Sequence, residues 1–251
     1  MNVLQANFIN ETQKMFLKSK VVACFIISAI IPVVIALLVA LLHNKVGVLA
    51  VGPAGYPVFI LGLFTSALLP LFIFMWAADI FAGELGEGNL KIVLVRPISR
   101  FKIYLSKTMA LGLSTILLLV VILIFTLISG IFLGGSGSDY LAGLGNGLKA
   151  YTAAIIPMVS LAIAASFIAQ FFKSSSGALT TSLFVYIAAR MLPVVLPSAA
   201  KVLLFSYTNW HTMWLGSLAA PEKLFYAFLI MLSSCIILFT SGFYLFDTKE
   251  L

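Results

Sequence analysis

The sequence predicts an all-α membrane protein with six transmembrane helices, an N-terminal helix on the membrane surface and a short cytosolic helix between the second and third spans. Two observations predict this class. Hydrophobic residues make up 62% of the chain and charged residues only 9%, a composition that cannot supply a water-facing surface. Several apolar runs of about 20 residues match the length that crosses about 30 Å of hydrocarbon. A soluble domain is therefore excluded.

Each apolar run is expected to form one spanning helix. The first run is longer than the core of a secretory signal and follows about 20 mixed residues, so its helix is expected to stay in the mature protein. Cys24 and Cys235 lie inside apolar runs and are expected to act as small hydrophobic residues. The six expected spans cover residues 21–42, 57–82, 108–133, 150–172, 178–196 and 224–246.

The distribution of Lys and Arg predicts the orientation. The first, third, fifth and seventh polar segments hold ten of the 15 positive residues. Cytosolic loops retain positive charge, so both termini are expected in the cytosol, with the spans in a bacterial inner membrane. These residues form no long stripe with interleaved aromatics, which argues against nucleic-acid binding. The other positive residues are Lys45, Lys149, Lys201 and Lys223 in the alternate segments, and Arg190 in the fifth span.

Residues 1–20 are expected to form an amphipathic helix in the cytosolic headgroup layer. Burial of its apolar side and attraction of its lysines to anionic lipid would hold it there. The alternative is an ordinary polar leader. The apolar side holds Leu4, Phe8, Ile9, Met15 and Phe16, and the polar side holds Asn7, Asn10, Lys14 and Lys18.

Three further features qualify this outline. Pro32, Pro70 and Pro157 lie inside spans and predict kinks. Residues 134–147 are rich in Gly and Ser and predict a flexible outer loop rather than a phosphate-binding loop. The sequence contains no GxxxxGK[ST] motif, so any ATP that the protein uses must be bound by another chain.

The connection between the second and third spans, residues 79–107, is too charged to span a membrane and too apolar for a linker. Residues 84–95 predict a short helix with carboxylates at its N-terminal end and Arg96 at its C-terminal end, as the helix dipole favours. Pro97 ends that helix, and Ser99 is placed to cap a second helix that continues into the third span. The apolar side of the first helix needs cover from the membrane interface or from another protein.

This connection carries an ordered set of residues: Glu84, Gly88, Asn89 and Leu90, then Arg96, Pro97, Ile98, Ser99 and Arg100, then Lys107. The set resembles the cytosolic signature of type-2 ATP-binding-cassette transporter permeases. That family usually has Glu, three residues, Gly-Thr-Leu, a short apolar stretch, Pro-hydrophobic-Ser-Arg, and a Lys that opens the third helix. Asn89 stands where Thr is commoner, which weakens any role for that hydroxyl. The resemblance extends to the topology of the whole chain, with residues 21–251 as the six-span permease domain.

The resemblance implies the permease subunit of an exporter, which forms the substrate path and dimerises with itself or with a related permease. A separate cytosolic ATPase would bind ATP and Mg, so this chain would not be an enzyme and would hold no catalytic, cofactor or metal site. Residues 84–95 would form the coupling helix that contacts the ATPase. Closure of the ATPase would then tilt the spans. The coupling residues implied by the resemblance are Glu84, Glu87, Gly88, Leu90, Arg96, Pro97, Ser99, Arg100 and Lys107.

Arg190 is the one charge deep inside an expected span, where a charge is costly. In one interpretation it lies on the transport path or pairs across the dimer. In the other, which the sequence favours, its long side chain reaches the nearby outer interface.

The acidic residues of the connection are expected to form structural ion pairs rather than an acid–base pair for catalysis. The residues concerned are Asp79, Glu84 and Glu87, with Lys91, Arg96 and Arg100 as the expected partners.

The remaining polar and aromatic residues of interest are expected on the outer side. His43 and His211 would lie at the membrane interface, because two ligands make an incomplete metal site. Tyr207, Trp210 and Trp214 recur at helical spacing and would anchor a short helix at the headgroup level, with lining of a substrate exit as the alternative.

Two other function classes compete with the exporter. An integral membrane enzyme acting on lipids would need clustered carboxylates or His at the cytosolic ends of spans. A secondary transporter would ordinarily show inverted repeats and ionisable residues at mid-membrane. The connection 79–107 has no counterpart at 173–177 in the second half of the chain, so the sequence favours the exporter. Its cargo stays open among amphiphilic peptides, antibiotics, lipids, polymers and small ions.

Overall fold

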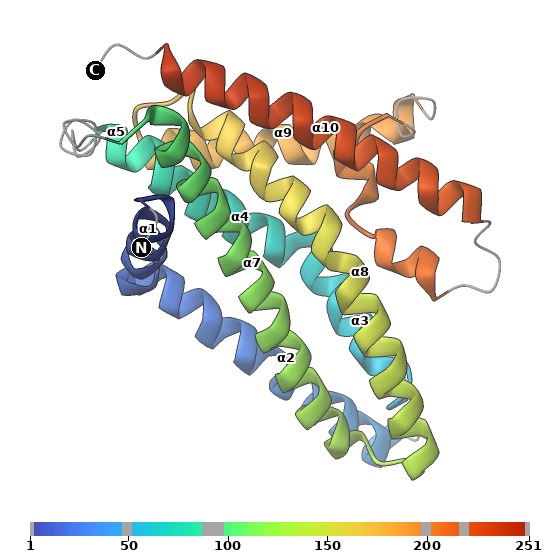
Figure 1. The fold of residues 1–251 in the computed structure, drawn as a ribbon. Coiled ribbons are helices and arrows are strands. Elements are labelled where there is room, and N and C mark those ends of the chain that lie inside the picture. The colour runs from blue at the N-terminus through green and yellow to red at the C-terminus, as the bar shows by residue number, and fades with distance from the viewer. Residues whose placement is uncertain (1–2, 47–51, 87–97, 197–201, 216–220, 249–251) are drawn as a thin grey trace.

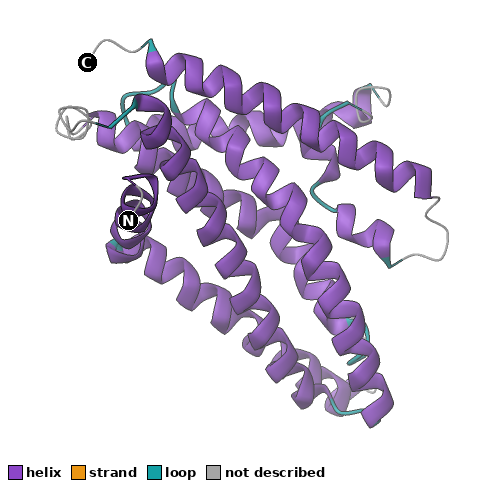
Figure 2. Ribbon diagram, in the orientation of Figure 1, coloured by secondary structure: helices purple, strands orange, loops and turns teal. Residues whose placement is uncertain are grey.

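The computed structural model describes residues 3–46, 52–86, 98–196, 202–215 and 221–248. Within these ranges the regular structure is helical and contains no strand (Figure 2). Six helices are long and apolar enough to cross a membrane. The predicted helical class and the six spans are therefore confirmed, and the chain is a multi-pass membrane protein.

The spans are Ser19–Leu42, Tyr56–Gly86, Arg100–Leu133, Gly137–Ala169, Ser175–Val195 and Pro221–Asp247. The helices outside the second span are α1 Val3–Leu17, α2 Ser19–Val46, α7 Arg100–Gly130 with the short 3-10 helix η3 Ile131–Leu133, α8 Gly137–Ala169, α9 Ser175–Val195, the 3-10 helices η5 Leu204–Tyr207 and η6 Trp210–Trp214, and α10 Pro221–Asp247.

The second span is segmented rather than uniform. Its segments are α3 Tyr56–Leu63, the π-helical turn η1 Phe64–Leu68, α4 Leu69–Ala77, the π-helical turn η2 Ala78–Gly83 and α5 Glu84–Gly86. Pro70 lies in the first turn of α4, directly after η1. A proline is tolerated there because the first turn of a helix does not need that N–H, and the preceding π turn already interrupts the regular hydrogen-bond pattern. The irregularity predicted at Pro70 is therefore a π turn.

The Gly- and Ser-rich segment 134–147 is not the expected flexible loop. Gly134 and Gly135 form the turn with positive φ, and Ser136 then opens α8 through a capping box with Asp139. The capping box satisfies the first free N–H groups of the helix. Two of the glycines that follow allow close packing, since a Cβ on Gly143 would lie 2.5 Å from the carbonyl oxygen of Pro53 and one on Gly147 would lie 3.0 Å from the Cβ of Pro57.

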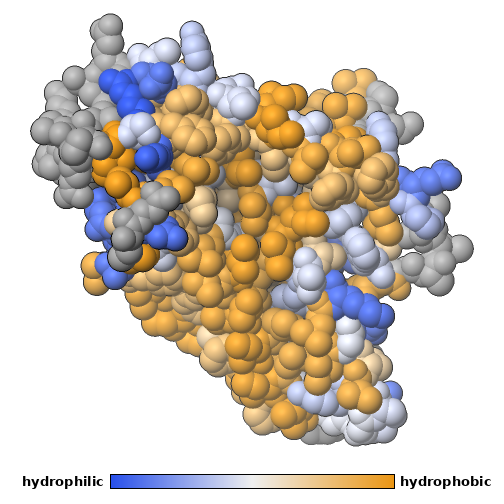
Figure 3. Space-filling model, viewed as in Figure 1, coloured by the Kyte–Doolittle hydropathy of each residue, from blue (hydrophilic) through white to orange (hydrophobic). Residues whose placement is uncertain are grey.

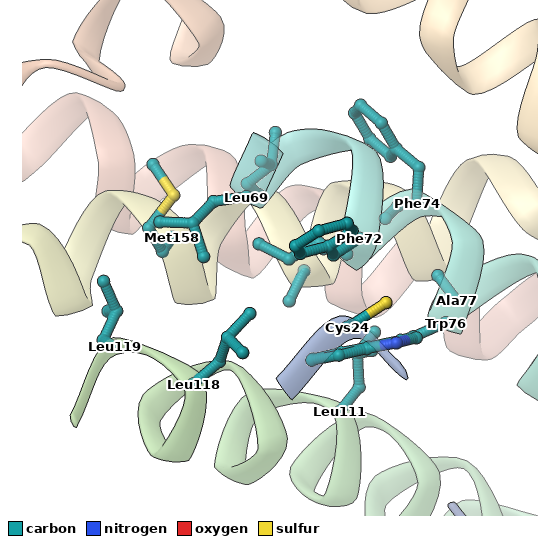
Figure 4. Packing of buried hydrophobic residues seen from close by; sticks show 14 of the residues in the cluster. Cys24, Leu69, Phe72, Phe74, Trp76, Ala77, Leu111, Leu118, Leu119 and Met158 are labelled. Carbon is teal, nitrogen blue, oxygen red and sulfur yellow. The ribbon is translucent and has the colours of Figure 1, made fainter. Parts of the chain in front are cut away.

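The second and fourth spans form the centre of the fold, and α2, α9 and α10 lie around them (Figure 1). In the most apolar stretch of the fourth span, 61% of the residues are buried within the chain, whereas in that of the sixth span 11% are buried. In the core, Trp76 lies beside Cys24 and Leu111, and Met158 lies beside Leu69 (Figure 4). The peripheral helices therefore present apolar side chains outward, as lipid requires.

Polar side chains gather at two opposite parts of the surface, with a broad apolar area between them (Figure 3). One part lies at the end that holds α1, α5 and the last turn of α10 (Figure 1). The end of the second span and the start of the third span meet here, so this end holds the candidate functional site.

Candidate functional site

A buried lysine joins three segments of the chain at the base of the third span. Lys107 of α7 has a fully buried side chain, and its Nζ lies 2.7 Å from Oε2 of Glu11 in α1 and 2.5 Å from Oε2 of Glu84 at the start of α5. Lys14 contacts the other carboxylate oxygen of Glu11 at 3.1 Å. We name Glu11, Lys14, Glu84 and Lys107 the ion-pair cluster.

The ion-pair cluster contains two carboxylates and two ammonium groups, so its formal charges balance. Charges that leave water are tolerated when each is paired and hydrogen-bonded, and removal of one partner leaves the other uncompensated. Burial by itself raises the pKa of Glu11, but the ammonium groups of Lys107 and Lys14 outweigh it and hold that pKa below the ordinary value. Glu11 is therefore ionised at neutral pH.

A stripe of α1 residues at four-residue spacing packs against the chain. Asn7, Glu11 and Met15 are buried, and the Asn7 side-chain amide donates to the Ser106 hydroxyl at 2.5 Å. The Ser114 hydroxyl lies 3.5 Å from the Met15 sulfur. Asn7 was predicted on the outward polar side of the helix, which is wrong: that stripe faces α7. A helical wheel separates two faces but does not say which one meets protein.

A second ion pair ties the start of α2 to the second span. Lys20 Nζ lies 3.2 Å from a carboxylate oxygen of Asp79 in η2, and Lys18 Nζ donates to the Asp79 carbonyl at 3.3 Å. The N-terminal segment therefore contacts the second span directly at Asp79, and it is joined to Glu84, five residues later, through Lys107, which pairs with both Glu11 and Glu84.

These contacts correct the expected ion-pair partners within the connection. Asp79 pairs with Lys20, and Glu84 pairs with Lys107, both across long stretches of sequence. Arg100 donates to the backbone carbonyl of Asp247 at the end of α10. The expected partners Lys91 and Arg96 lie outside the described residues.

Of the residues implied by the resemblance, the structure brings Glu84 and Lys107 together. Ser99 occupies the N-cap position of α7, as expected, but its side chain makes no capping hydrogen bond. Arg100 is the first residue of α7. Outside the described residues lie most of the predicted helix 84–95 and five members of the set: Glu87, Gly88, Leu90, Arg96 and Pro97.

Arg190 lies far from the ion-pair cluster along the fold and contacts its own chain. Its Nη1 donates to the Thr208 hydroxyl at 2.8 Å, and its guanidinium lies 5.9 Å from the ring centre of Tyr186. The Tyr186 hydroxyl in turn donates to the carbonyl of Ser66 in η1 at 3.0 Å. We name Ser66, Tyr186, Arg190 and Thr208 the arginine cluster, which links the second and fifth spans to the segment after α9.

The segment after α9 is more deeply packed than an interfacial helix. Trp210 is 2% exposed and His211 is fully buried, while Trp214 is 50% exposed. Burial lowers the pKa of His211 to about 4, so it is neutral at pH 7. Because η6 packs against α8, the Trp210 side chain does not reach the surface, so the expectation that it anchors a surface helix is wrong. The placement of His211 at the level of the membrane interface stays a prediction. The side chain of His43 lies outside the described residues.

Two comparisons place the chain among known sequences. The family described as "Protein of unknown function (DUF2705)" matches residues 52–250. The protein "Uncharacterized protein YhcI" of Bacillus subtilis (strain 168) is 26% identical over 159 residues, which cover 56% of this chain and 51% of the relative. The chain thus matches about half the length of that curated relative. The family match includes Glu84 and Lys107, whereas Glu11 and Lys14 precede it.

Proposed function

The chain belongs to the DUF2705 family of proteins of unknown function, and we propose that it is the permease subunit of an ATP-driven exporter that works with a separate cytosolic ATPase. One observation carries the proposal. Lys107 pairs with both Glu84 and Glu11, so the N-terminal helix is fixed to residues near both ends of the connection 79–107. A partner that binds this connection would then move three elements at once.

Force on the connection needs a rigid attachment to reach the spans. The side chain of Lys107 is fully buried and those of Glu11 and Glu84 are 4% and 12% exposed, where ionic contacts are screened less than in water. α1, the end of the second span and α7 therefore respond as one body, which is the behaviour that rigid-body gating requires. The energy must come from a nucleotide that binds two states of the ATPase with different affinity. This chain alone is expected to be inert.

The second span has the irregularities that a moving element needs. Its π turns η1 and η2 flank α4, and π turns interrupt regular helices frequently at functional sites. η2 contains Asp79 and lies directly before Glu84. In η1, the carbonyl of Ser66 accepts a hydrogen bond from the Tyr186 hydroxyl. Each π turn thus lies beside one polar contact region, so α4 connects the ion-pair cluster to the arginine cluster.

The proposal includes an orientation. The ion-pair cluster, α1 and both termini would lie on the cytosolic side of a bacterial cell membrane, because positive residues are concentrated in the segments at that end. α1 would lie at the headgroup layer, and two permease subunits would form the complete path. The cargo class is left open by this geometry.

Co-purification with the ATPase tests the proposal directly. The tagged chain is extracted gently from its native host, and a cassette-type ATPase is expected in the purified complex. Substrate-stimulated ATP hydrolysis by the reconstituted complex is expected to fall at least about tenfold in Lys107→Met, which corresponds to about 1.4 kcal/mol of lost coupling. Lys223→Gln, at the far end of α10, serves as the matched control and should leave hydrolysis unchanged.

Two outcomes would count against the exporter. One is a well-folded, purified chain that brings no ATPase with it. The other is a cysteine at position 90 that reacts with a membrane-impermeant reagent added outside intact cells, since this would put the connection on the wrong side of the membrane.

A further inference from the structure

Two adjoining cavities lie between α8, η6 and α10, at the other side of the fold from the ion-pair cluster (Figure 1). Their volumes are about 430 Å³ and about 540 Å³, and both are lined by Ile156, Trp210 and Trp214. Because these walls are shared, the cavities are neighbours, and together they form one recessed surface. We name it the aromatic groove, with Lys149 at one end and Phe225 and Phe228 on the α10 side.

The lining of the aromatic groove is mostly apolar, and its polar groups are the Lys149 ammonium, the Thr152 hydroxyl and the indole N–H groups of Trp210 and Trp214. Trp210 and Trp214 meet edge to face at 5.3 Å and form one wall, and α10 contributes Phe225 and Phe228. Lys149 is exposed at the end of the groove. Each cavity alone has the volume of a small-molecule site. This combination favours an amphiphile with one negative charge and a long apolar part.

The depth of Lys149 follows from the contacts between α7 and α8. The Thr126 hydroxyl of α7 lies 3.3 Å from the Tyr151 hydroxyl of α8, so the two residues share one level. Thr126 follows Lys107 by nineteen residues on α7, which is about 28 Å of helix. That length is close to the hydrocarbon thickness of about 30 Å. With Lys107 taken as the level of one membrane boundary, Lys149, two residues before Tyr151, lies near the opposite boundary.

The aromatic walls lie deeper than the cation. Ile156 follows Lys149 by seven residues towards the ion-pair end of α8, which is about 10 Å. On α10, Phe228 lies the same number of residues inward from Pro221. The groove therefore has its positive charge at headgroup depth and its aromatic surface at acyl-chain depth. A phospholipid in the adjacent leaflet has its charge and its chains in this same order.

We propose that the aromatic groove binds one anionic phospholipid from the leaflet opposite the ion-pair cluster, with its phosphate at Lys149 and an acyl chain along Trp214, Ile156 and Phe228. Charge complementarity selects an anionic lipid over a zwitterionic one. The other charged side chains at this end of α10, Glu222 and Lys223, are adjacent and of opposite sign, so Lys149 supplies the net positive charge. The inference requires neither an ATPase nor transport and stands apart from the proposed function.

Quenching of tryptophan fluorescence by brominated lipid tests this site. The chain has three tryptophans, and Trp76→Phe leaves only Trp210 and Trp214, both in the groove. The purified chain is placed in bilayers of phosphatidylglycerol and phosphatidylcholine, with bromine on the acyl chains of one or the other lipid. Brominated phosphatidylglycerol is expected to quench with a relative affinity about fivefold higher, the effect of one lysine beside an anionic headgroup.

The matched variants separate the groove from general surface charge. Lys149→Gln is expected to abolish the preference for phosphatidylglycerol, with a relative affinity of about one. Lys223→Gln, outside the groove, should preserve the preference. Lys149 is exposed, so its replacement should not affect folding. Equal quenching by the two lipids would show that the groove contacts bulk lipid without selecting a headgroup. An unchanged preference in Lys149→Gln would show that the anionic headgroup binds elsewhere. Absence of quenching by either lipid would mean that protein, such as a second copy, covers the groove; each of these results overturns the proposal.

Discussion

The ion-pair cluster and the arginine cluster are two polar regions within a mostly apolar chain, and they handle charge differently. In the first, two carboxylates face two ammonium groups, and Lys107 is fully buried. In the second, the contacts of Arg190 among the described residues are a hydroxyl and an aromatic ring, both neutral. A balanced cluster can fix several elements deep inside the protein, whereas a single cation must stay partly exposed. The first region should therefore be far more sensitive to mutation than the second.

Lys107→Met is expected to have the largest effect on this comparison. It leaves Glu11 and Glu84 close together and buried without their shared cation, and breaking such a pair costs about 3–5 kcal/mol. The free energy of unfolding in detergent, measured by denaturant titration, should fall by that amount. Lys20→Met removes the partner of Asp79 with a lysine that is 62% exposed, so it should cost at most about 1 kcal/mol. Similar losses of unfolding free energy in both variants would show that burial does not make the ion-pair cluster more important for stability than the exposed pair.

Acidification should weaken the ion-pair cluster through Glu11. The pKa of Glu11 is lowered from an ordinary value of 4.5 in the folded chain, so its ionised form contributes stability that is fully present above that pH. This contribution should decline as the pH falls below 4.5 and be lost once the pH passes the folded-state pKa. Melting temperatures of the wild type and Glu11→Gln, measured between pH 3 and pH 7, should converge at the acid end. A constant difference across this range would contradict the assignment.

The arginine cluster should show a smaller coupling. A double-mutant cycle with Arg190→Met and Thr208→Val isolates the bond between guanidinium and hydroxyl. Its coupling energy is expected to be about 1.5 kcal/mol, at the lower end for a charged hydrogen bond because Arg190 is only partly buried. A coupling as large as the effect of Lys107→Met would erase the distinction between the two regions.

The spans could be predicted from the sequence because lipid imposes a simple rule on length and polarity. The apolar runs located all six, and the ends shifted where capping extended a helix, as at Ser136 before α8. The segmentation of the second span could not be predicted, since a π turn adds one residue without changing the apolar composition of a run. Fold class thus follows from composition, whereas the local geometry depends on packing.

The site was predicted only in part, and for a physical reason. Glu84 and Lys107 stand in the ordered set that resembles a known signature, so both were singled out. Glu11 was missed because it lies 96 residues from Lys107 in sequence and sits on a helix whose contact face the sequence does not define. One usable signal was present: Asn7, Glu11 and Met15 repeat every four residues and form a single stripe on α1.

The two π turns make the second span unequally tolerant of shortening. A π turn holds one residue more than the regular helix that it interrupts. Deletion of Ala67 from η1 would therefore give an ordinary α-helix, and the side chains on both sides of the deletion would keep their orientation. Met75 lies in the regular helix α4, where no extra residue is present. Its deletion would rotate the part of the span that follows it by about 100° around the helix axis. Glu84 would then point away from Lys107. Two deletions eight positions apart are thus expected to have opposite consequences, one silent and the other uncoupling the span from its neighbours.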